Sequence, residues 1–382
     1  MTIAMVHGRA DPAQDGVADY TAHLVDALRA HGTNVVPVPT DPGPLGAAQA
    51  ARRLRAMAPT LVHVQFAPSA YRFSPWIGLI PDVVGAPVVT TLHEYGWWAA
   101  PSWVPARAWA GLERRARLDR ETWRLAPASA AVLTTNAGHA ATVAARLGRA
   151  AVTVPLAPNV ADSGPGEGRA AVRARLGVPL DADVVVFFGF VHPVKGVRYL
   201  IEAVARLRPR HDRLHLLVLG GFTSLALPAD EACAFRRELT DWAATCGVQD
   251  HVTITGHLAA AQVSAALHAA DVAVFPFTAG ATTKSGALLS AFAHGLPTVV
   301  TAADPADPEL VDGENVVVAR RVRDGGAVAD ALEKLLADPA LRARIARGGA
   351  EVGAERTWQR IAARHQELYA EVGRRVHSHG LC

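Results

Sequence analysis

Lysine is nearly absent from this chain of 382 residues. Of its 38 basic side chains only Lys195, Lys284 and Lys334 are lysines, so almost all of the positive charge is arginine. Acidic residues number 35 and nearly balance the basic ones, and no long polybasic run is present. This balance argues against nucleic acid as a partner.

Cysteine is scarce as well. The three cysteines form no CxxC motif and are too few for a disulfide framework. The sequence also has no apolar run of 18 residues, and its beginning lacks the basic and then apolar pattern of a signal peptide. We therefore expect a cytoplasmic protein in a reducing compartment.

Common nucleotide and metal motifs are missing or misplaced. The glycine run at 164–168 has no strand before it and contains Pro165, so it resembles a spacer more than a dinucleotide loop. Residues 283–286 lack the upstream glycine spacing of an ATP-binding loop. Asp181 and Asp183 have the spacing of a metal-binding DxD, but they precede a strand, where turn residues are common. We expect neither a metal ion nor a cofactor.

Hydrophobic residues make up half of the chain, and they predict an α/β protein. Short β-branched runs alternate with amphipathic helical stretches such as 197–207, which is typical of parallel sheets covered by helices on both faces. We therefore expect two doubly wound, Rossmann-like domains. The expected strands are 2–7, 34–38, 61–64, 87–91, 131–134, 151–154, 183–188, 214–219, 252–255, 271–275 and 297–301.

The domain boundaries follow from composition. Residues 1–157 form the expected N-terminal domain and 158–355 the C-terminal domain, of which 158–177 is a glycine- and proline-rich linker. Residues 356–382 form a closing helix and tail. Doubly wound sheets bind ligands at the carboxyl ends of their strands, so we expect the site in a cleft between the two domains.

Junctions between strands and helices carry the candidate binding residues. Lys195 stands at a helix start after a glycine turn, where a cation is unfavourable unless an anion lies beside it. Lys284 holds a similar place in a second junction, and two such helix starts in one domain predict a diphosphate ligand. The alternative for both lysines is simple solvation. Asp15 and Gly16 form a third junction, which either faces an anionic or hydroxyl-rich ligand or is only a tight turn.

A histidine ends one expected strand of the first domain. His93 follows the strand at 87–91, and its neutral imidazole can both donate and accept near pH 7. It suits a sugar hydroxyl or a proton transfer, and the alternative is a structural histidine.

In their order along the chain, these segments resemble the retaining family 4 glycosyltransferases of the GT-B fold. The resemblance covers nearly the whole chain. It rests on Asp15-Gly16, Thr91-Leu92-His93 and the segments 134–139, 188–196, 293–300 and 308–315.

The resemblance implies transfer of a sugar from a nucleotide-diphosphate sugar, most commonly a UDP-sugar, without a metal ion. The second domain would hold the donor, the first domain the acceptor, and the last helix would return to the first domain. His93 and Lys195 match the family's catalytic positions. The donor-binding residues implied are Gly16, Gly189, His192, Lys195, Gly256, His257, Leu258, Thr282, Thr283, Lys284, Ser285, Gly286, Ala287 and Ser290.

The chain departs from the family pattern at three of its positions. Thr282 and Ser290 stand where the family usually has two glutamates that hold the donor sugar and the ribose. Phe190 replaces a common arginine, with His192 nearby as a substitute. We expect Lys284, Ser285 and the backbone amides before Ala287 to take over these contacts.

The acceptor is a small molecule, a carrier-bound intermediate or a lipid-linked sugar. The acceptor-side candidates are Asp15, Tyr20, Tyr95, Trp97 and Trp98. Segment 97–124 is rich in tryptophan and arginine, so it either rests on a membrane surface or is ordinary packed helix. Two other functions stay open: a nucleotide-sugar epimerase, and a nucleotide-sugar-binding protein without catalysis.

Overall fold

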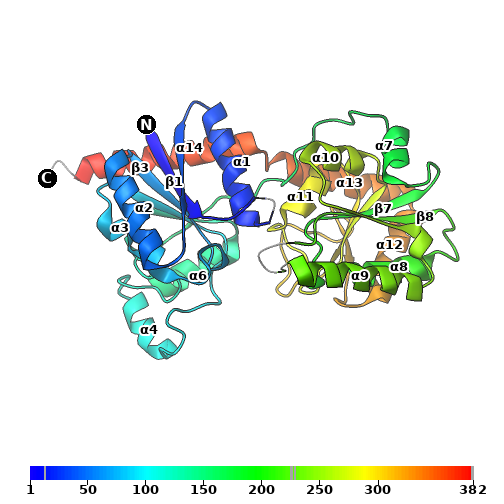
Figure 1. The fold of residues 1–382 in the computed structure, drawn as a ribbon, viewed down its shortest axis with the longest axis horizontal. Helices are drawn as coiled ribbons and strands as arrows, with labels where there is room; N and C mark the ends of the chain where they lie inside the picture. Colours follow the sequence, from blue (N-terminus) through cyan, green and yellow to red (C-terminus); the bar gives the residue numbers. More distant parts are fainter. Residues whose placement is uncertain (13, 224–226, 228, 380–382) are drawn as a thin grey trace. The chain divides into compact units, whose positions relative to one another are not determined.

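Two separate parallel β-sheets organise the chain (Figure 1). The computed structural model describes residues 1–12, 14–223, 227 and 229–379. They divide into unit 1, which contains Met1–Pro155 and the segment from Trp358 onward, and unit 2, Leu156–Thr357. Both boundaries lie within two residues of the positions suggested by composition.

The sheet of unit 1 contains six strands that all run parallel, in the order β2-β1-β3-β4-β5-β6. All six expected strands are confirmed, with ends that shift by one or two residues. Strands β3 and β4 are buried along their whole length, as expected for a sheet with helices on both faces. The strands are β1 (Thr2–Gly8), β2 (Asn34–Thr40), β3 (Leu61–Phe66), β4 (Val88–Leu92), β5 (Ala131–Thr134) and β6 (Val152–Thr153).

Helix α1 begins directly after the loop that leaves β1. The Asp15 carboxylate caps it by accepting a hydrogen bond from the Ala18 amide at 2.7 Å. Leu24 and Leu28 on its inner face are fully buried. The helices of unit 1 are α1 (Gly16–Ala30), α2 (Gly43–Met57), α3 (Ile80–Val83), α4 (Ala106–Glu113), α5 (Leu125–Ala128), α6 (Ala137–Leu147) and α14 (Trp358–His379), with the short turns η1 (Ser69–Tyr71) and η2 (Pro75–Leu79).

The last helix, α14, packs against α1 of unit 1. Ile361 and Tyr369 on its inner face are buried, and the Gln366 side chain donates to the His31 carbonyl at 2.9 Å. Unit 1 is therefore built from both ends of the chain. The family resemblance implies this return of the closing helix; residues 380–382 of the expected segment lie outside the described residues.

Unit 2 repeats the architecture with a parallel sheet in the order β12-β11-β10-β7-β8-β9. The expected strands 183–188 and 214–219 are confirmed residue for residue as β7 and β8. The edge strand β12 was not expected from the sequence. The strands are β7 (Asp183–Phe188), β8 (Leu214–Leu219), β9 (Val252–Gly256), β10 (Val272–Phe275), β11 (Thr298–Thr301) and β12 (Val317–Ala319).

Helix α8 shows how hydrophobic periodicity builds this unit. Its five apolar side chains at 197, 200, 201, 204 and 207 are each at most 1% exposed. Burial of each contributes about 1.5–3 kcal/mol, which fixes the helix on the sheet. The helices are α7 (Arg169–Leu176), α8 (Val197–Leu207), α9 (Ala229–Thr245), α10 (Ala260–His268), α11 (Gly286–Ala293), α12 (Gly325–Ala337) and α13 (Pro339–Ala354), with the short turns η3 (Pro193–Lys195) and η4 (Gln249–His251).

The structure corrects the linker expected over 158–177. The Val160 amide donates to the Ser290 hydroxyl at 3.0 Å, and Val172 is fully buried. Arg173 is also buried and forms an ion pair with Asp271 at 2.9 Å. Glycine and proline content suggested a spacer, but these long-range contacts make the segment part of unit 2.

Candidate functional site

Glycines bring together the carboxyl ends of three neighbouring strands in unit 2. Gly189 follows β7, Gly220 follows β8 and Gly256 ends β9, with φ angles of 132°, 147° and 80°. A Cβ on Gly220 would lie 1.9 Å from the Gly189 carbonyl oxygen, and the Gly220 amide donates to the Gly256 carbonyl at 3.1 Å. The strand ends therefore meet through backbone alone, which allows a ligand to approach closely.

Lys195 lies in the loop that leaves this edge of the sheet. It ends the η3 turn, and its ammonium lies 4.1 Å from the centroid of the Phe277 ring. Burial lowers the pKa of Lys195. Within the described part of the chain no carboxylate lies within 4.0 Å of this ammonium. A largely desolvated cation without a counter-ion is suited to bind an anion.

The start of α11 lies beside the same loop. A Cβ on Gly189 would lie 3.4 Å from the Ala287 Cβ, so the glycine turn and the first turn of α11 are in contact. Ser285 caps the helix by accepting from the Leu288 amide at 3.2 Å. The amides of Gly286 and Ala287 donate to no group in the described ranges. Free amides and the helix dipole together favour an anion here.

Three candidate side chains in this region hold the fold together instead of facing a ligand. Ser290 is fully buried; its hydroxyl donates to the Gly286 carbonyl at 2.7 Å and accepts from Val160. Thr283 is buried, and its amide and hydroxyl lie 2.7 and 2.9 Å from an Asp307 carboxylate oxygen. The Thr282 hydroxyl accepts from the Lys284 amide at 3.4 Å. The structure therefore gives no support to donor contacts through the Ser290 and Thr283 hydroxyls, because both are already used internally.

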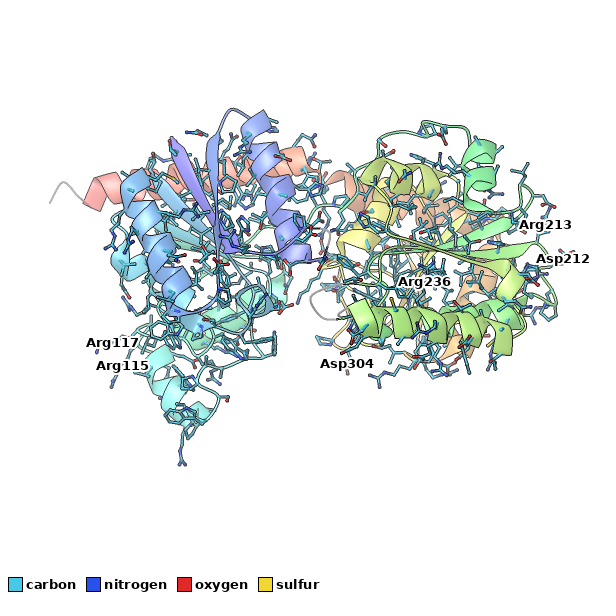
Figure 2. The ribbon with its side chains drawn as sticks, viewed as in Figure 1. Arg115, Arg117, Asp212, Arg213, Arg236 and Asp304 are labelled. Atoms are coloured by element: carbon cyan, nitrogen blue, oxygen red, sulfur yellow. The ribbon has the colours of Figure 1, made fainter. Side chains whose placement is uncertain are left out.

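The other donor-side candidates remain accessible. His192 is half-buried, and its Nδ1 accepts from the Val194 amide at 3.3 Å, so it begins the lysine turn. His257 and Lys284 are exposed. Leu258 packs on the hydrophobic core of unit 2. Arg236, whose side chain projects from α9 in Figure 2, donates to the Ile254 carbonyl at 3.2 Å close to this edge.

His93 lies at the carboxyl end of β4 in unit 1 and is held by buried polar neighbours. Its Nε2 lies 2.8 Å from the Gln65 side-chain oxygen, and its ring meets the Tyr20 ring edge to face at 4.8 Å. Burial lowers the pKa of His93 to about 3, so the imidazole is neutral. The sequence placed this histidine at the strand end but gave no signal for its partners.

The hydrogen bonds around Gln65 define which His93 nitrogen carries the proton. An amide oxygen only accepts, so Nε2 of His93 must donate to it and Nδ1 carries the lone pair. The Gln65 amide nitrogen lies 3.2 Å from His63 Nε2, and His63 Nδ1 lies 2.6 Å from the Tyr369 hydroxyl. Since His93 is partly exposed, its Nδ1 is available as an acceptor for a hydroxyl proton.

At the start of α1, Asp15 and Tyr20 are buried, whereas Gly16 has open space beside it. The Asp15 carboxylate is used as the helix cap, and burial raises its pKa. Tyr20 is 6% exposed and packs between His93 and Trp358. The acceptor contacts expected of these two side chains are not supported, because both are buried. Open space lies next to Gly16, where an added Cβ would meet no atom within 4 Å.

Segment 97–124 is part of the packed structure of unit 1. The Tyr95 hydroxyl donates to the fully buried Asp119 at 2.7 Å, so the acceptor contact expected of Tyr95 gains no support from the structure. Trp97 is 59% exposed and Trp98 half-buried, and both rings meet Phe73. Figure 2 shows Arg115 and Arg117 projecting away from the sheet beside α4. None of the described helices is long and apolar enough to cross a membrane.

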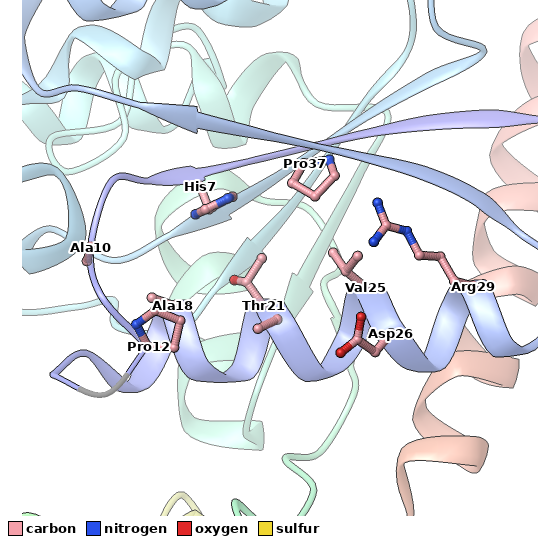
Figure 3. Close-up of a pocket in the computed structure, with 10 residues that line it drawn as sticks. His7, Ala10, Pro12, Ala18, Thr21, Val25, Asp26, Arg29 and Pro37 are labelled. Carbon is pink, nitrogen blue, oxygen red and sulfur yellow. The ribbon is translucent and has the colours of Figure 1, made fainter.

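A pocket of about 240 Å³ opens in unit 1 between α1 and the strands β1 and β2 (Figure 3). Thr21, Val25 and Asp26 line it from α1, and Pro37 closes it from β2. His7 contributes an imidazole, whose pKa is lowered by burial. This pocket is separate from the residues singled out in the sequence.

Solved structures with the same architecture identify the fold. HepE from Anabaena in complex with UDP and glucose matches with a TM-score of 0.71 at 18% identity, over 97% of this chain and 100% of that one. Sucrose-phosphate synthase from Thermosynechococcus elongatus matches with a TM-score of 0.71 at 20% identity, over 97% of this chain and 99% of that one. The chain has the GT-B fold, as the sequence resemblance predicted.

The family match lies in unit 2. Residues 182–338 match the family model described as "Glycosyl transferases group 1". A D-inositol 3-phosphate glycosyltransferase of Stackebrandtia nassauensis is 35% identical over 202 residues, 52% of this chain and 43% of the relative. A D-inositol 3-phosphate glycosyltransferase of Xylanimonas cellulosilytica is 32% identical over 215 residues, which are 54% of this chain and 46% of the relative. The matched part thus spans less than half the length of these relatives.

Proposed function

We propose that this chain is a glycosyltransferase that takes its sugar from a nucleotide-diphosphate sugar bound by unit 2. The observation that carries the proposal is the Lys195 ammonium, largely desolvated against Phe277 with no carboxylate within 4.0 Å among the described residues. Gly189 connects this lysine turn to the first turn of α11, where two amides are free to donate. A point charge beside helix-start amides matches the chemistry of a diphosphate.

The nucleotide we propose is a uridine diphosphate. Structures of Anabaena HepE with UDP, and with UDP-glucose, share this fold. Gly189, Gly220 and Gly256 present backbone without side chains at the strand ends, which is the surface we propose for the nucleotide. His257 and Leu258 follow directly and stay candidates for contact with the base.

The proposed mechanism stabilises the leaving diphosphate. As the bond between sugar and phosphate breaks, negative charge grows on the phosphate oxygens, and Lys195 with the α11 amides stabilises it. These groups supply positive charge without a metal ion. The resemblance to family 4 implies retention. Because no carboxylate nucleophile stands among the donor-side candidates, we propose that the acceptor attacks on the face that the diphosphate leaves. The leaving phosphate then takes the acceptor proton.

Several acceptors are to be tested. The curated relatives are named for D-inositol 3-phosphate, so this compound is the first to try. Carrier-bound and lipid-linked acceptors follow, and membrane contact through segment 97–124 stays a prediction.

The test compares Lys195 with Lys334 by calorimetry with UDP and with GDP. Hydrogen bonds to charged groups contribute about 1.5–3 kcal/mol, so Lys195→Met is expected to weaken UDP binding roughly tenfold to hundredfold. Lys334→Ala removes an exposed lysine from α12 and is the matched control, with unchanged binding expected. Equal binding by wild type and Lys195→Met would refute the diphosphate site.

Product analysis separates transfer from the other functions. With a UDP-sugar and an acceptor, a transferase releases free UDP and forms a glycoside. An epimerase converts the donor sugar without an acceptor, and a binding protein releases no UDP.

A further inference from the structure

Within the part of the chain that the structure describes, Asp162, His268 and His294 form a group spaced to share a metal ion. All three belong to unit 2: Asp162 precedes α7, His268 ends α10 and His294 follows α11. We propose that these residues bind one divalent transition-metal ion of the Zn²⁺ type. No sequence motif indicates this site, because its members are 106 and 26 positions apart.

The distances between the ligand atoms bracket those of a zinc site. The Nε2 atoms of His268 and His294 lie 2.7 and 4.0 Å from Oδ1 of Asp162, and all three ligand atoms lie within 4.8 Å of one another. A tetrahedral Zn²⁺ with bonds of about 2.0–2.1 Å holds its ligand atoms about 3.3 Å apart. Side-chain rotations that move the ligand atoms by roughly 1 Å therefore bring the three atoms to this spacing.

His294 is already oriented as a metal ligand. Its Nδ1 lies 2.7 Å from the Ser290 carbonyl oxygen, so Nδ1 donates and Nε2 carries the lone pair. A histidine that donates its other N–H to a backbone carbonyl is the usual arrangement around protein metals. The side chain is 0% exposed, which fixes the ring. The Ser264 hydroxyl donates to Nε2 at 2.8 Å, and the ion replaces this hydrogen bond.

Asp162 and His268 supply the open side of the site. Oδ1 of Asp162 accepts from the Gly164 amide at 2.7 Å, and its second lone pair, which now faces His268 Nε2 at 2.7 Å, is the one that binds the ion. When His268 binds through Nε2, its proton moves to Nδ1, which makes no hydrogen bond to a described residue. These side chains are 40% and 23% exposed, so an ion can enter and a water can fill the fourth position. Two imidazoles and one carboxylate suit Zn²⁺ better than Mg²⁺ or Ca²⁺.

The ion would fasten the segment 158–164 to α10 and α11. Hydrogen bonds already attach this segment: the Asn159 amide donates to the Gly286 carbonyl at 3.2 Å, Val160 donates to Ser290, and the Ser163 amide donates to the Ser264 hydroxyl of α10 at 3.2 Å. The metal adds a link from Asp162 to His294, the residue that follows α11. We therefore expect a structural ion that stabilises unit 2.

The experiment titrates the full chain, purified without a histidine tag, with Zn²⁺ alone, and follows Co²⁺ by its visible absorption. One equivalent of Zn²⁺ is expected to bind and to raise the Tm. His268→Ala and Asp162→Asn are each expected to weaken binding at least tenfold, and the rise in Tm is then lost.

His211→Ala is the matched control. His211 lies in the same unit, is 21% exposed and pairs with Glu333 at 3.1 Å, but no third residue of the described chain stands close enough to share a metal ion with this pair. Zn²⁺ binding is expected to be unchanged in this variant. Absence of stoichiometric binding, or equal binding by wild type and both site variants, would overturn the proposal. No nucleotide enters this experiment, so its outcome is independent of the proposed function.

Discussion

Replacement of Arg146 by methionine is expected to destabilise unit 1 by several kcal/mol. The Arg146 guanidinium lies 2.6 Å from Glu121 and 3.9 Å from Asp119, and both carboxylates are 0% exposed. The substitution leaves two buried negative charges with no counter-charge from Arg146. Loss of one partner from a buried ion pair costs about 3–5 kcal/mol, so we expect a loss of this size.

The loss should depend on pH. Burial raises the pKa of Asp119 and of Glu121 even with Arg146 present, and removal of the guanidinium raises both further. A carboxyl whose pKa is higher in the folded state binds its proton more tightly there, so folding stability falls as pH rises from the unfolded pKa through the folded pKa. Arg146→Met is therefore expected to be more destabilised near pH 7 than near pH 5.

Urea unfolding followed by tryptophan fluorescence measures the loss of folding stability in unit 1. Seven of the eight tryptophans lie in unit 1, and Trp242 alone lies in unit 2. Arg124→Met is the matched control, because Arg124 pairs with Asp82 at 3.0 Å on the surface with 35% and 38% exposure. Such exposed pairs contribute about 0.2–1 kcal/mol. The reasoning is refuted if the two variants lose similar stability, or if the loss in Arg146→Met does not change with pH.

Two further predictions concern the candidate sites. Nitrogen-15 NMR of the imidazoles should show His93 neutral near pH 7 with its proton on Nε2, and Gln65→Leu should shift this signal; a charged His93, or a proton on Nδ1, would contradict the hydrogen-bond assignment. Gly220→Ala is expected to cost about 1–3 kcal/mol for its φ of 147° alone, with a clash against Gly189 in addition. Gly164→Ala, at φ 79° with no atom within 4 Å of the added Cβ, should be clearly milder in urea unfolding.

Local patterns in the sequence were enough for the architecture of both units. Strands β7 and β8 and helix α8 occur residue for residue where hydrophobic periodicity predicted them, because burial on a sheet requires that spacing. Lys195 was singled out from the same kind of local pattern and stays a prediction, since a lysine at a helix start after a glycine turn is unfavourable without an anion. The resemblance to GT-B glycosyltransferases added the return of the last helix.

Long-range contacts decided which polar side chains are used within the fold and which come together at a site. Ser290 aligned with a family binding position, but the inner face of α11 buries its hydroxyl and ties it to Val160. The linker composition at 158–168 gave no sign that this segment packs on unit 2. Asp162, His268 and His294 meet only because three distant segments fold together. The sequence by itself determined the elements, because each depends on neighbours a few residues away; the tertiary structure decided which polar groups are used internally and which stay open to a ligand.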